Sequence, residues 1–267
     1  MSIQDHFSAE AETAEEAARE AGSVLMAFFG KSYRVEEKGK GNPVTTADLE
    51  ANVKIRETIL GCFPKDGWLS EEDKDSPERL TAVRVWVVDP MDGTKEFIQG
   101  VPQFSVSIAL VVDGRPVVGV VYNPCEGNLF RAVAERGTTL NDRPVRISAR
   151  DDLQGALLLI SRSEPRRKFQ PFAELCRLEP VGSIAYRLAL VAAGQGDGTL
   201  TLRSIRDWDV CAGELIVREA GGIVSDGSGQ SLVFNQRDTL HRGIVASNRI
   251  LSRRLQGILA GILADRR

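Results

Sequence analysis

Histidine is scarce in this chain, and its cysteines are not spaced as metal ligands. Of the 267 residues only two are histidines, His6 and His241, and neither lies near an acidic cluster in the sequence. The cysteines form no CxxC pair, and we expect them to be reduced thiols rather than a disulfide framework. They are Cys62, Cys125, Cys176 and Cys211. Because protein zinc sites are built mainly from imidazole and thiolate ligands, the sequence argues against a zinc centre.

Long apolar runs and a basic charge balance are also missing. No segment is apolar over the length that crosses a bilayer, and the N-terminal segment lacks the charged-then-apolar pattern of a secretion signal. The formal net charge of −3 at pH 7 gives no broad attraction to nucleic acid polymers. Neither a membrane nor a nucleic acid is therefore expected as a partner, and the expected location is the cytoplasm.

Carboxylates, in contrast, are plentiful, and two of them follow an apolar run. Residues 85–88 predict a short buried strand, which places Asp89 where the strand leaves the sheet. Pro90 and Gly93 predict a turn in which Gly93 adopts φ > 0 and exposes its backbone N–H. Asp89 and Asp92 would then share one corner with free amide groups, which suits Mg²⁺ and a phosphate together. A lone Asp-Pro-x-Asp-Gly is more often a plain turn, so further acids are needed.

Two more acidic segments have the form that would complete such a site. Glu71 lies in the segment 69–73, although a cluster of this kind is usually a solvated loop. Asp209 begins a segment with apolar residues at helical spacing that stops at Gly221-Gly222. An aspartate at a helix start is ordinarily a cap, and the alternative for Asp209 is a metal ligand.

A further carboxylate, Asp48, follows Thr45 by three residues ahead of a predicted helix. This spacing is typical of a capping box, which is the simplest interpretation of Asp48. The alternative is a carboxylate near the metal corner that polarises a hydroxyl or a water. The helix is predicted from the apolar residues Leu49, Val53, Ile59, Leu60 and Phe63.

The acids constrain the chemistry because like charges repel. Four carboxylates in one site would keep some protons at neutral pH unless cations were present. Two Mg²⁺ or Mn²⁺ ions would balance them, would stabilise the attacking and leaving oxygens of an in-line displacement, and would lower the pKa of bound water. The four acids are Glu71, Asp89, Asp92 and Asp209.

A rival phosphatase motif differs in spacing. The haloacid-dehalogenase-like enzymes carry Asp-x-Asp-Gly-Thr, in which one carboxylate becomes an aspartyl phosphate. Here two residues separate Asp89 from Asp92, so in a regular extended segment they would face opposite sides. The spacing argues against that class and predicts turnover without a phospho-enzyme.

Taken together, these segments resemble the inositol monophosphatase superfamily of Mg²⁺-dependent, lithium-sensitive phosphatases. The resemblance spans nearly the whole chain, and the set in this order is highly specific. Met91 replaces the Ile or Leu of many members, but only its main-chain carbonyl is needed. The matching segments are Pro43-Val44-Thr45-Thr46-Ala47-Asp48, Ser70-Glu71-Glu72, Asp89-Pro90-Met91-Asp92-Gly93-Thr94, Trp208-Asp209-Val210-Cys211-Ala212-Gly213 and Glu219-Ala220-Gly221-Gly222.

The resemblance implies a role for each matching residue. Glu71, Asp89 and the carbonyl of Met91 would bind the first metal, and Asp89, Asp92 and Asp209 the second. Asp48 and Thr94 would activate the attacking water, so the implied catalytic residues are Asp48, Thr94 and Glu71. The implied substrate-binding residues are Met91, Asp92, Gly93, Thr94, Ser161 and Asp209. Two or three Mg²⁺ ions are implied, with Mn²⁺ as a substitute.

The resemblance also implies the layered sugar-phosphatase fold, an αβαβα sandwich of an α+β half and an α/β half. We place the first half at residues 1–152, with most metal ligands, and the second at 153–267, with Asp209 and the specificity elements. Family members are often homodimers, but no exposed apolar stripe in the sequence predicts one. Periodicity predicts helices at 14–28 and 182–194 and strands at 104–110, 116–122, 129–134, 156–160, 199–202, 222–224 and 243–246, the last strands alternating with helices.

Substrate choice rests on fewer residues. The segment 94–97, Thr-Lys-Glu-Phe, looks more like the 3′(2′),5′-bisphosphate nucleotidase branch, which converts adenosine 3′,5′-bisphosphate to AMP and phosphate. Inositol-specific members more often carry Thr-Asn-Phe there, with a glutamate seven residues before the helix-start aspartate, where this chain has Leu202. Residues 161–163, Arg203 and Arg206 would bind a second phosphate, or are solvated charges.

Two alternatives to the nucleotidase remain open. One is an inositol-1-phosphatase or a broad sugar-phosphate phosphatase. The other, of a different class, is a metal- and phosphate-binding protein without turnover. Asp48 and Thr94 argue against the second, because water activation alone requires them and both are present.

Overall fold

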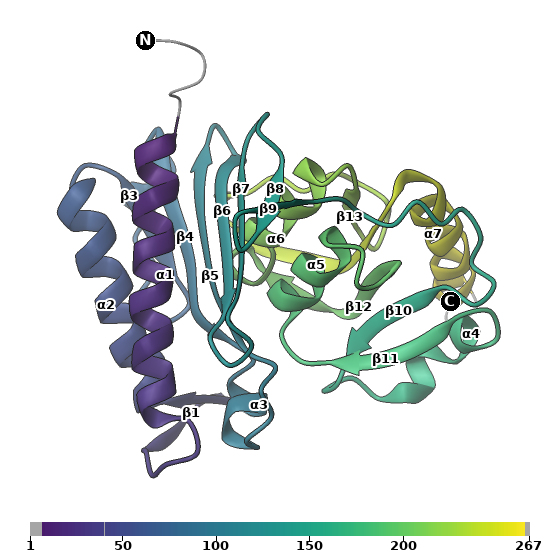
Figure 1. The fold of residues 1–267 in the computed structure, drawn as a ribbon, viewed down its shortest axis with the longest axis horizontal. Coiled ribbons are helices and arrows are strands. Elements are labelled where there is room, and N and C mark those ends of the chain that lie inside the picture. The colour runs from purple at the N-terminus through teal and green to yellow at the C-terminus, as the bar shows by residue number, and fades with distance from the viewer. Residues whose placement is uncertain (1–6, 40, 265–267) are drawn as a thin grey trace.

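The computed structural model describes residues 7–39 and 41–264, and its elements stack in five layers (Figure 1). Two long helices, a seven-stranded sheet, two central helices, a five-stranded sheet and an outer helical layer follow one another across the molecule. This is the αβαβα arrangement expected from the sequence. Among the described helices, none combines the length and the apolar character that crossing a bilayer requires.

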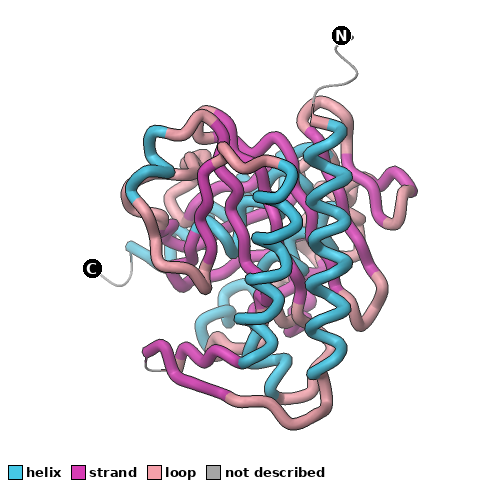
Figure 2. Tube along the Cα trace, turned by 90° about the vertical axis from the view of Figure 1, so that its left-hand side faces the viewer, coloured by secondary structure: helices cyan, strands magenta, loops and turns pink. Residues whose placement is uncertain are grey.

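The first layer consists of α1 (Ser8–Phe28) and α2 (Thr46–Cys62), which lie side by side on one face of the larger sheet (Figure 2). α1 buries a row of alanines, whose short side chains let it pack closely. α2 buries Ala47, Ala51, Ile55 and Ile59 at four-residue spacing. Leu49 and Val53, which helped to predict α2, lie on its other face and are 45% and 55% exposed.

The seven-stranded sheet runs in the order β3-β4-β5-β6-β7-β8-β9, with β3 and β4 parallel and the other neighbours antiparallel. A turn at Asp113-Gly114, between the two predicted strands, joins β5 to β6, with φ of 51° and 74° at these residues. The strands are β3 (Gly67–Ser70), β4 (Arg84–Asp92), β5 (Ser105–Val112), β6 (Arg115–Asn123), β7 (Asn128–Val133), β8 (Thr138–Leu140) and β9 (Arg143–Val145).

The five-stranded sheet runs in the order β11-β10-β12-β14-β13. The predicted alternation of strands and helices fails after β13, because residues 227–239 form a loop and β14 returns antiparallel to β13. The strands are β10 (Leu157–Ser161), β11 (Arg177–Val181), β12 (Gly198–Arg206), β13 (Ile223–Asp226) and β14 (Leu240–Ser247). The 3-10 helix η3 (Arg166–Phe169), α4 (Gln170–Ala173) and α7 (Arg249–Ala264) belong to the outer layer.

The central layer consists of α5 (Ile184–Ala192) and α6 (Asp207–Glu219), packed between the two sheets (Figure 1). Every residue of α5 is buried, as expected for a helix covered on both sides. One apolar cluster joins residues of both sheets through these helices, including Phe130, Leu188 and Val224. The two halves therefore share a core, and the proposed boundary between residues 152 and 153 lies between β9 and β10. Its status as a domain boundary stays a prediction.

Several short elements were not predicted. One is the hairpin of β1 (Val35–Gly39) and β2 (Asn42–Thr45), which leads directly into α2. Another is α3 (Thr94–Ile98), which begins directly after Gly93. A further 3-10 helix, η2, covers Pro77–Thr81. β1 is exposed along its whole length, so it has no apolar alternation to predict it.

Candidate active site

β4 carries both acids of the central motif, and it continues to Asp92 rather than ending at Asp89 as expected. Asp89 pairs with Ser107 of β5 and Asp92 with Ser105, so β4 has one more residue than β5 between these pairs. Ser105 and Ser107 share a face of β5, and this bulge therefore turns both aspartates to one side. The argument that their spacing puts them on opposite faces was wrong for this reason.

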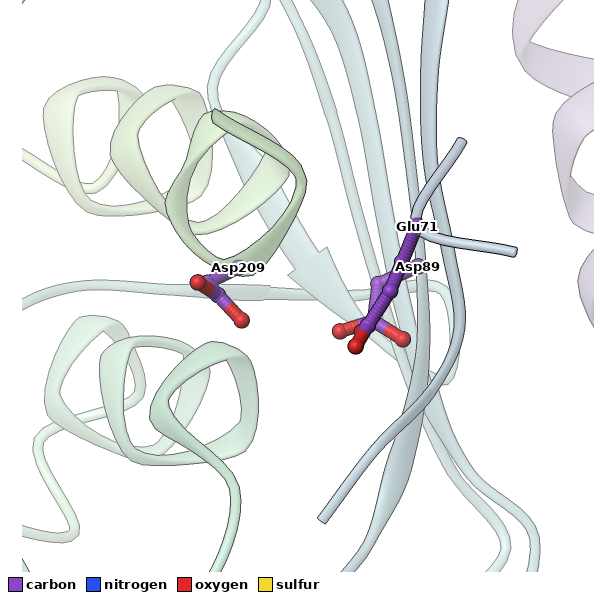
Figure 3. Close-up of side chains that lie close together, drawn as sticks. All are labelled: Glu71, Asp89 and Asp209. Atoms are coloured by element: carbon purple, nitrogen blue, oxygen red, sulfur yellow. The ribbon is translucent and has the colours of Figure 1, made fainter. Parts of the chain in front are cut away.

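Three carboxylates from separate elements converge beside the end of β4. Oxygens of Glu71, Asp89 and Asp209 all lie within 4.8 Å of one another. Figure 3 shows Glu71 and Asp89 side by side, with Asp209 facing them from the first turn of α6. β3 and β4 are parallel, so Glu71, just after β3, is held at the level of Asp89, and its N–H donates to Val88 O at 3.1 Å.

Asp89 has an oxygen with no hydrogen-bond partner. Its Oδ1 accepts from Met91 N at 3.0 Å, whereas its buried Oδ2 has no partner among the described residues. Burial, followed by the charges of Glu71, Asp92 and Asp209, raises the pKa of Asp89 well above its ordinary value. A buried, unpaired acceptor among other oxygen ligands fits a hard divalent cation such as Mg²⁺ or Mn²⁺.

Asp209 is both a cap and a member of this cluster. Its Oδ2 accepts from Arg206 N at 2.6 Å, which completes a capping interaction at the start of α6. Burial, with the charges of Asp92 and Glu71, raises the pKa of Asp209 to about 8. The capping interpretation is therefore confirmed, and the other oxygen stays available for the metal-ligand role, which remains a prediction.

Asp48 divides its oxygens in the same way. Its Oδ2 accepts from Thr45 N at 2.7 Å and from Thr45 Oγ1 at 2.6 Å, which is the predicted capping box. Its Oδ1 accepts from Thr94 Oγ1 at 2.9 Å, across 46 residues of sequence. Burial raises the pKa of Asp48, and the hydrogen bonds from Thr45 and Thr94 oppose this change. The Asp48–Thr94 pair lies next to the acid cluster because Thr94 follows directly on the β4 motif.

Asp92 is oriented differently from the three clustered acids. Its Oδ2 accepts from Ser183 Oγ at 2.6 Å and from Ala185 N at 2.7 Å, at the start of α5. Burial raises the pKa of Asp92, and these two hydrogen bonds oppose that. Ser183 itself has φ of 55°, an uncommon conformation for a residue other than glycine. Asp92 thus joins the first sheet to the central layer beside the site.

Gly93 has the positive φ that its place after Asp92 predicted. Its φ is 104°, and a Cβ built on it would lie 3.1 Å from Gln103 O and 3.1 Å from Phe104 Cα. A side chain at this position would be strained both by the positive φ and by these two short contacts.

Lys38, in the unpredicted hairpin, contacts the acids from the solvent side. Its Nζ lies 2.8 Å from Glu71 Oε1 and 2.7 Å from Glu72 Oε1. Burial disfavours the charge on Lys38, but Glu71 and Glu72 outweigh it and raise its pKa. Burial raises the pKa of Glu72 to about 7, although Lys38 opposes this. No sequence signal singled out Lys38, because it is one of several lysines in an exposed segment.

A cleft of about 270 Å³ opens at this point between the halves. All eight residues predicted as metal or substrate ligands line it, and Asp48 lies behind Thr94. Arg203 lines the cleft as predicted. Arg206 instead contacts Thr239 and Asp238 and is absent from the lining. The eight are Glu71, Asp89, Met91, Asp92, Gly93, Thr94, Ser161 and Asp209.

Arg187 lines the same cleft and was not predicted. It lies on α5, where its Nη1 donates to Thr199 Oγ1 at 3.0 Å and Leu200 O at 3.1 Å. Its buried Nε has no acceptor among the described residues, and burial lowers its pKa to about 10. The available signal was a single cation inside an otherwise apolar helix, a costly position for a charge without a role.

The expectation that neither histidine lies near an acidic segment needs correction for His241. His6 lies outside the described residues. His241 is distant in sequence, yet its Nε2 lies 2.7 Å from Asp207 Oδ1, because β14 pairs with β12 and places His241 opposite Ile205. It contacts the acidic segment of α6 but does not belong to the Glu71–Asp89–Asp209 cluster, which contains only carboxylates.

Known proteins match this chain over almost its whole length. The profile of the Inositol monophosphatase family matches residues 8–266. The chain belongs to the inositol monophosphatase family. Inositol monophosphatase 2 of Solanum lycopersicum is 37% identical over 250 residues, covering 89% of this chain and 92% of that protein.

A second relative of this family member is the inositol-1-monophosphatase of Synechocystis, 39% identical over 224 residues, with 80% of this chain and 77% of that protein covered. The Nus factor SuhB of Escherichia coli is 38% identical over 224 residues, covering 80% and 83%. The crystal structure of the extragenic suppressor protein suhB from Bartonella henselae has a TM-score of 0.86 and 33% identity, covering 94% of this chain and 98% of that chain. This inositol monophosphatase family protein is thus a phosphoric monoester hydrolase with the family's layered fold.

Proposed function

We propose that this family member hydrolyses small phosphate monoesters by attack of a metal-activated water. The observation that carries the proposal is the convergence of Glu71, Asp89 and Asp209 within 4.8 Å, beside the hydrogen-bonded pair of Asp48 and Thr94. A binding protein without turnover would need the acids but has no use for a buried carboxylate behind a hydroxyl. The pair therefore favours an enzyme.

Mg²⁺ is the cation that we propose, with Mn²⁺ as a substitute and two or three ions in the working enzyme. Glu71, Asp89 and the Met91 carbonyl would hold one ion, and Asp89, Asp92 and Asp209 another. When bound, these ions supply positive charge for the phosphoryl oxygens and lower the pKa of bound water. The unpaired Asp89 Oδ2 supports the central place of Asp89 in both sets.

The chain's own residues would position the reactants and move one proton. Thr94 Oγ1 donates a hydrogen bond to Asp48 Oδ1, so its lone pairs would accept a hydrogen bond from a water facing the phosphorus. As this water attacks, its proton would pass to Thr94 Oγ1 while the Thr94 hydroxyl proton passes to Asp48. The N–H groups of Gly93 and Thr94, the cap and first residue of α3, would hold phosphoryl oxygens. Met91 O accepts weakly from Thr94 Oγ1 at 3.3 Å and limits the rotation of this hydroxyl.

For the substrate we propose adenosine 3′,5′-bisphosphate. Two arginines, Arg187 and Arg203, line the cleft in addition to the acids, and their charge adds to the positive potential that favours a substrate with more than one phosphate. Glu96, also in the lining, suits a ribose or a polyol hydroxyl alike. Inositol 1-phosphate is the second candidate, because two of the relatives above are named inositol monophosphatases.

A phosphate-release assay tests both parts of the proposal. Purified protein in MgCl₂ receives adenosine 3′,5′-bisphosphate, inositol 1-phosphate or fructose 1,6-bisphosphate at equal concentrations, with and without a chelator. We expect chelator-sensitive release, inhibited by lithium and fastest with the adenosine substrate. Equal or faster release from inositol 1-phosphate would reject the nucleotidase, and trapping of a phospho-enzyme would reject the water mechanism. A cytoplasmic location and a homodimer stay predictions.

A further inference from the structure

A second pocket adjoins the metal cleft and shares one wall with it. It has a volume of about 220 Å³ and lies between α3, the segment after β10, and Pro180. Ser161 and Ser163, whose hydroxyls are 3.0 Å apart, line both spaces together with Lys95 and Glu96. A molecule held at Thr94 by its phosphate can therefore extend into this pocket without leaving the protein surface.

Three cations line this second pocket. They are Lys95, Arg162 and Arg166, and no ion-pair or hydrogen-bond acceptor engages their side chains within residues 7–39 and 41–264. The carboxylate in the lining is that of Glu96. Burial raises its pKa, and Arg162 is among the groups that oppose this rise. The surplus of positive charge suits a doubly charged anion, and guanidinium groups bind phosphate through paired hydrogen bonds.

The segment that carries the two arginines is anchored rather than free. Glu164 lies between them and is buried, and it accepts hydrogen bonds from Thr201 Oγ1 and from Leu202 N on β12. Arg162 and Arg166, two residues away on each side, are exposed and line the pocket. An anchored backbone lowers the entropy lost when these side chains engage a ligand.

We propose that Lys95, Arg162 and Arg166 form a subsite for a second phosphate group of the substrate. The inference rests on the proposed function and refines it: the preferred substrates are monoesters with another phosphate several bonds from the one that is hydrolysed. Arg162 and Arg166 act as specificity-determining residues, because they contact the distal group and not the reacting atoms.

The test compares two substrates that differ only in the distal phosphate, adenosine 3′,5′-bisphosphate and adenosine 3′-monophosphate. In the Mg²⁺-loaded protein we expect kcat/KM to favour the bisphosphate. In the double variant Arg162→Ala/Arg166→Ala we expect this preference to fall roughly 10-fold or more, through KM. Arg167→Ala is the matched control, since Arg167 is exposed beside Arg166 but lies outside the pocket lining.

Several results would overturn the subsite. An unchanged preference in the double variant, an equal loss for both substrates, or a parent protein that treats both substrates alike would each do so. If neither substrate is hydrolysed, the proposed function fails instead, and calorimetric titration with AMP and with adenosine still tests the subsite. AMP must then bind more tightly than adenosine to the parent, and this difference must be lost in the double variant.

Discussion

The substitution Asp209→Asn should stabilise the metal-free protein while it removes the response to Mg²⁺. Asp209 belongs to a carboxylate cluster, and burial with neighbouring charge raises its pKa from 3.8 to about 8. Between about pH 4 and pH 8, the folded protein therefore keeps a proton on Asp209 that the unfolded chain has already released. Its stability falls as the pH rises through that window. Asparagine carries no charge there, and its amide oxygen can still accept from Arg206 N.

The magnitude follows from the same displacement. Each pH unit between the folded and unfolded pKa corresponds to about 1.4 kcal/mol, so the full displacement from 3.8 to about 8 sets a ceiling near 6 kcal/mol. Asp89 competes for the same proton, and we therefore expect a gain of about 2 kcal/mol at pH 8 in a chelator. For a domain of this size that gain corresponds to roughly 4–8 °C in Tm. At pH 5 the difference in stability between variant and parent should be smaller, because Asp209 of the folded parent then keeps its proton.

Thermal unfolding of parent and variant at pH 5 and pH 8, in EDTA and in MgCl₂, tests the prediction. At Mg²⁺ concentrations about 100 times Kd the parent should gain about 2.7 kcal/mol, and the variant far less. Asp238→Asn is the control, since Asp238 is an exposed aspartate outside the cleft lining, which pairs with Arg206 at 3.6 Å and accepts from Leu240 N at 3.1 Å. A variant less stable than the parent in EDTA at pH 8 would refute the reasoning about the cluster. A stability difference between variant and parent that does not change with pH would refute it as well.

Three further predictions follow from the contacts. Asp48→Asn and Thr94→Ala should each lower kcat by about 10²–10⁴ and keep the stabilisation by Mg²⁺, as steady-state rates and melting curves would show; a fully active Asp48→Asn would contradict the pair's role. Dialysis against EDTA should abolish phosphate release, with recovery in Mg²⁺ or Mn²⁺; activity that survives full chelation would exclude the metal mechanism. Gly213→Ala should cost about 1–3 kcal/mol in urea unfolding, because its Cβ would lie 2.5 Å from Leu188 Cδ1. Its control is Gly61→Ala in α2, where a Cβ meets no atom within 4 Å and no loss is expected.

The parts of the fold that the sequence predicted are those with a strong internal pattern. α1, the hairpin of β5 and β6, and α5 each have apolar residues at a clear period, and each was found at its expected place, although α1 begins six residues earlier than expected, at Ser8. β1 is exposed along its whole length, and β2 and α3 are only four and five residues long, so none of the three shows such a period. The exposure of Leu49 could not be predicted, because it depends on which face of α2 meets the sheet.

The site shows the same division. Its acids were predicted because each stands in a motif with turn and cap residues around it. The bulge between Asp89 and Asp92 was not, because it depends on the register with β5, which the sequence of β4 alone does not contain. Arg187 was missed for a similar reason: only the packed structure shows that its buried helix passes the cleft.

The placement of Asp209 across the cleft from Glu71 and Asp89 has a thermodynamic consequence. Asp89 belongs to the seven-stranded sheet, Glu71 directly follows its strand β3 and Asp209 belongs to α6, so an ion that binds all three requires α6 to be packed against this sheet. Any such ion also opposes separation of α6 from the sheet, since ligands that bind only the native state stabilise it. Cation affinity and the stability of α6 packing are therefore thermodynamically linked, and a substitution that weakens the packing of α6 should also lower the affinity for the cation.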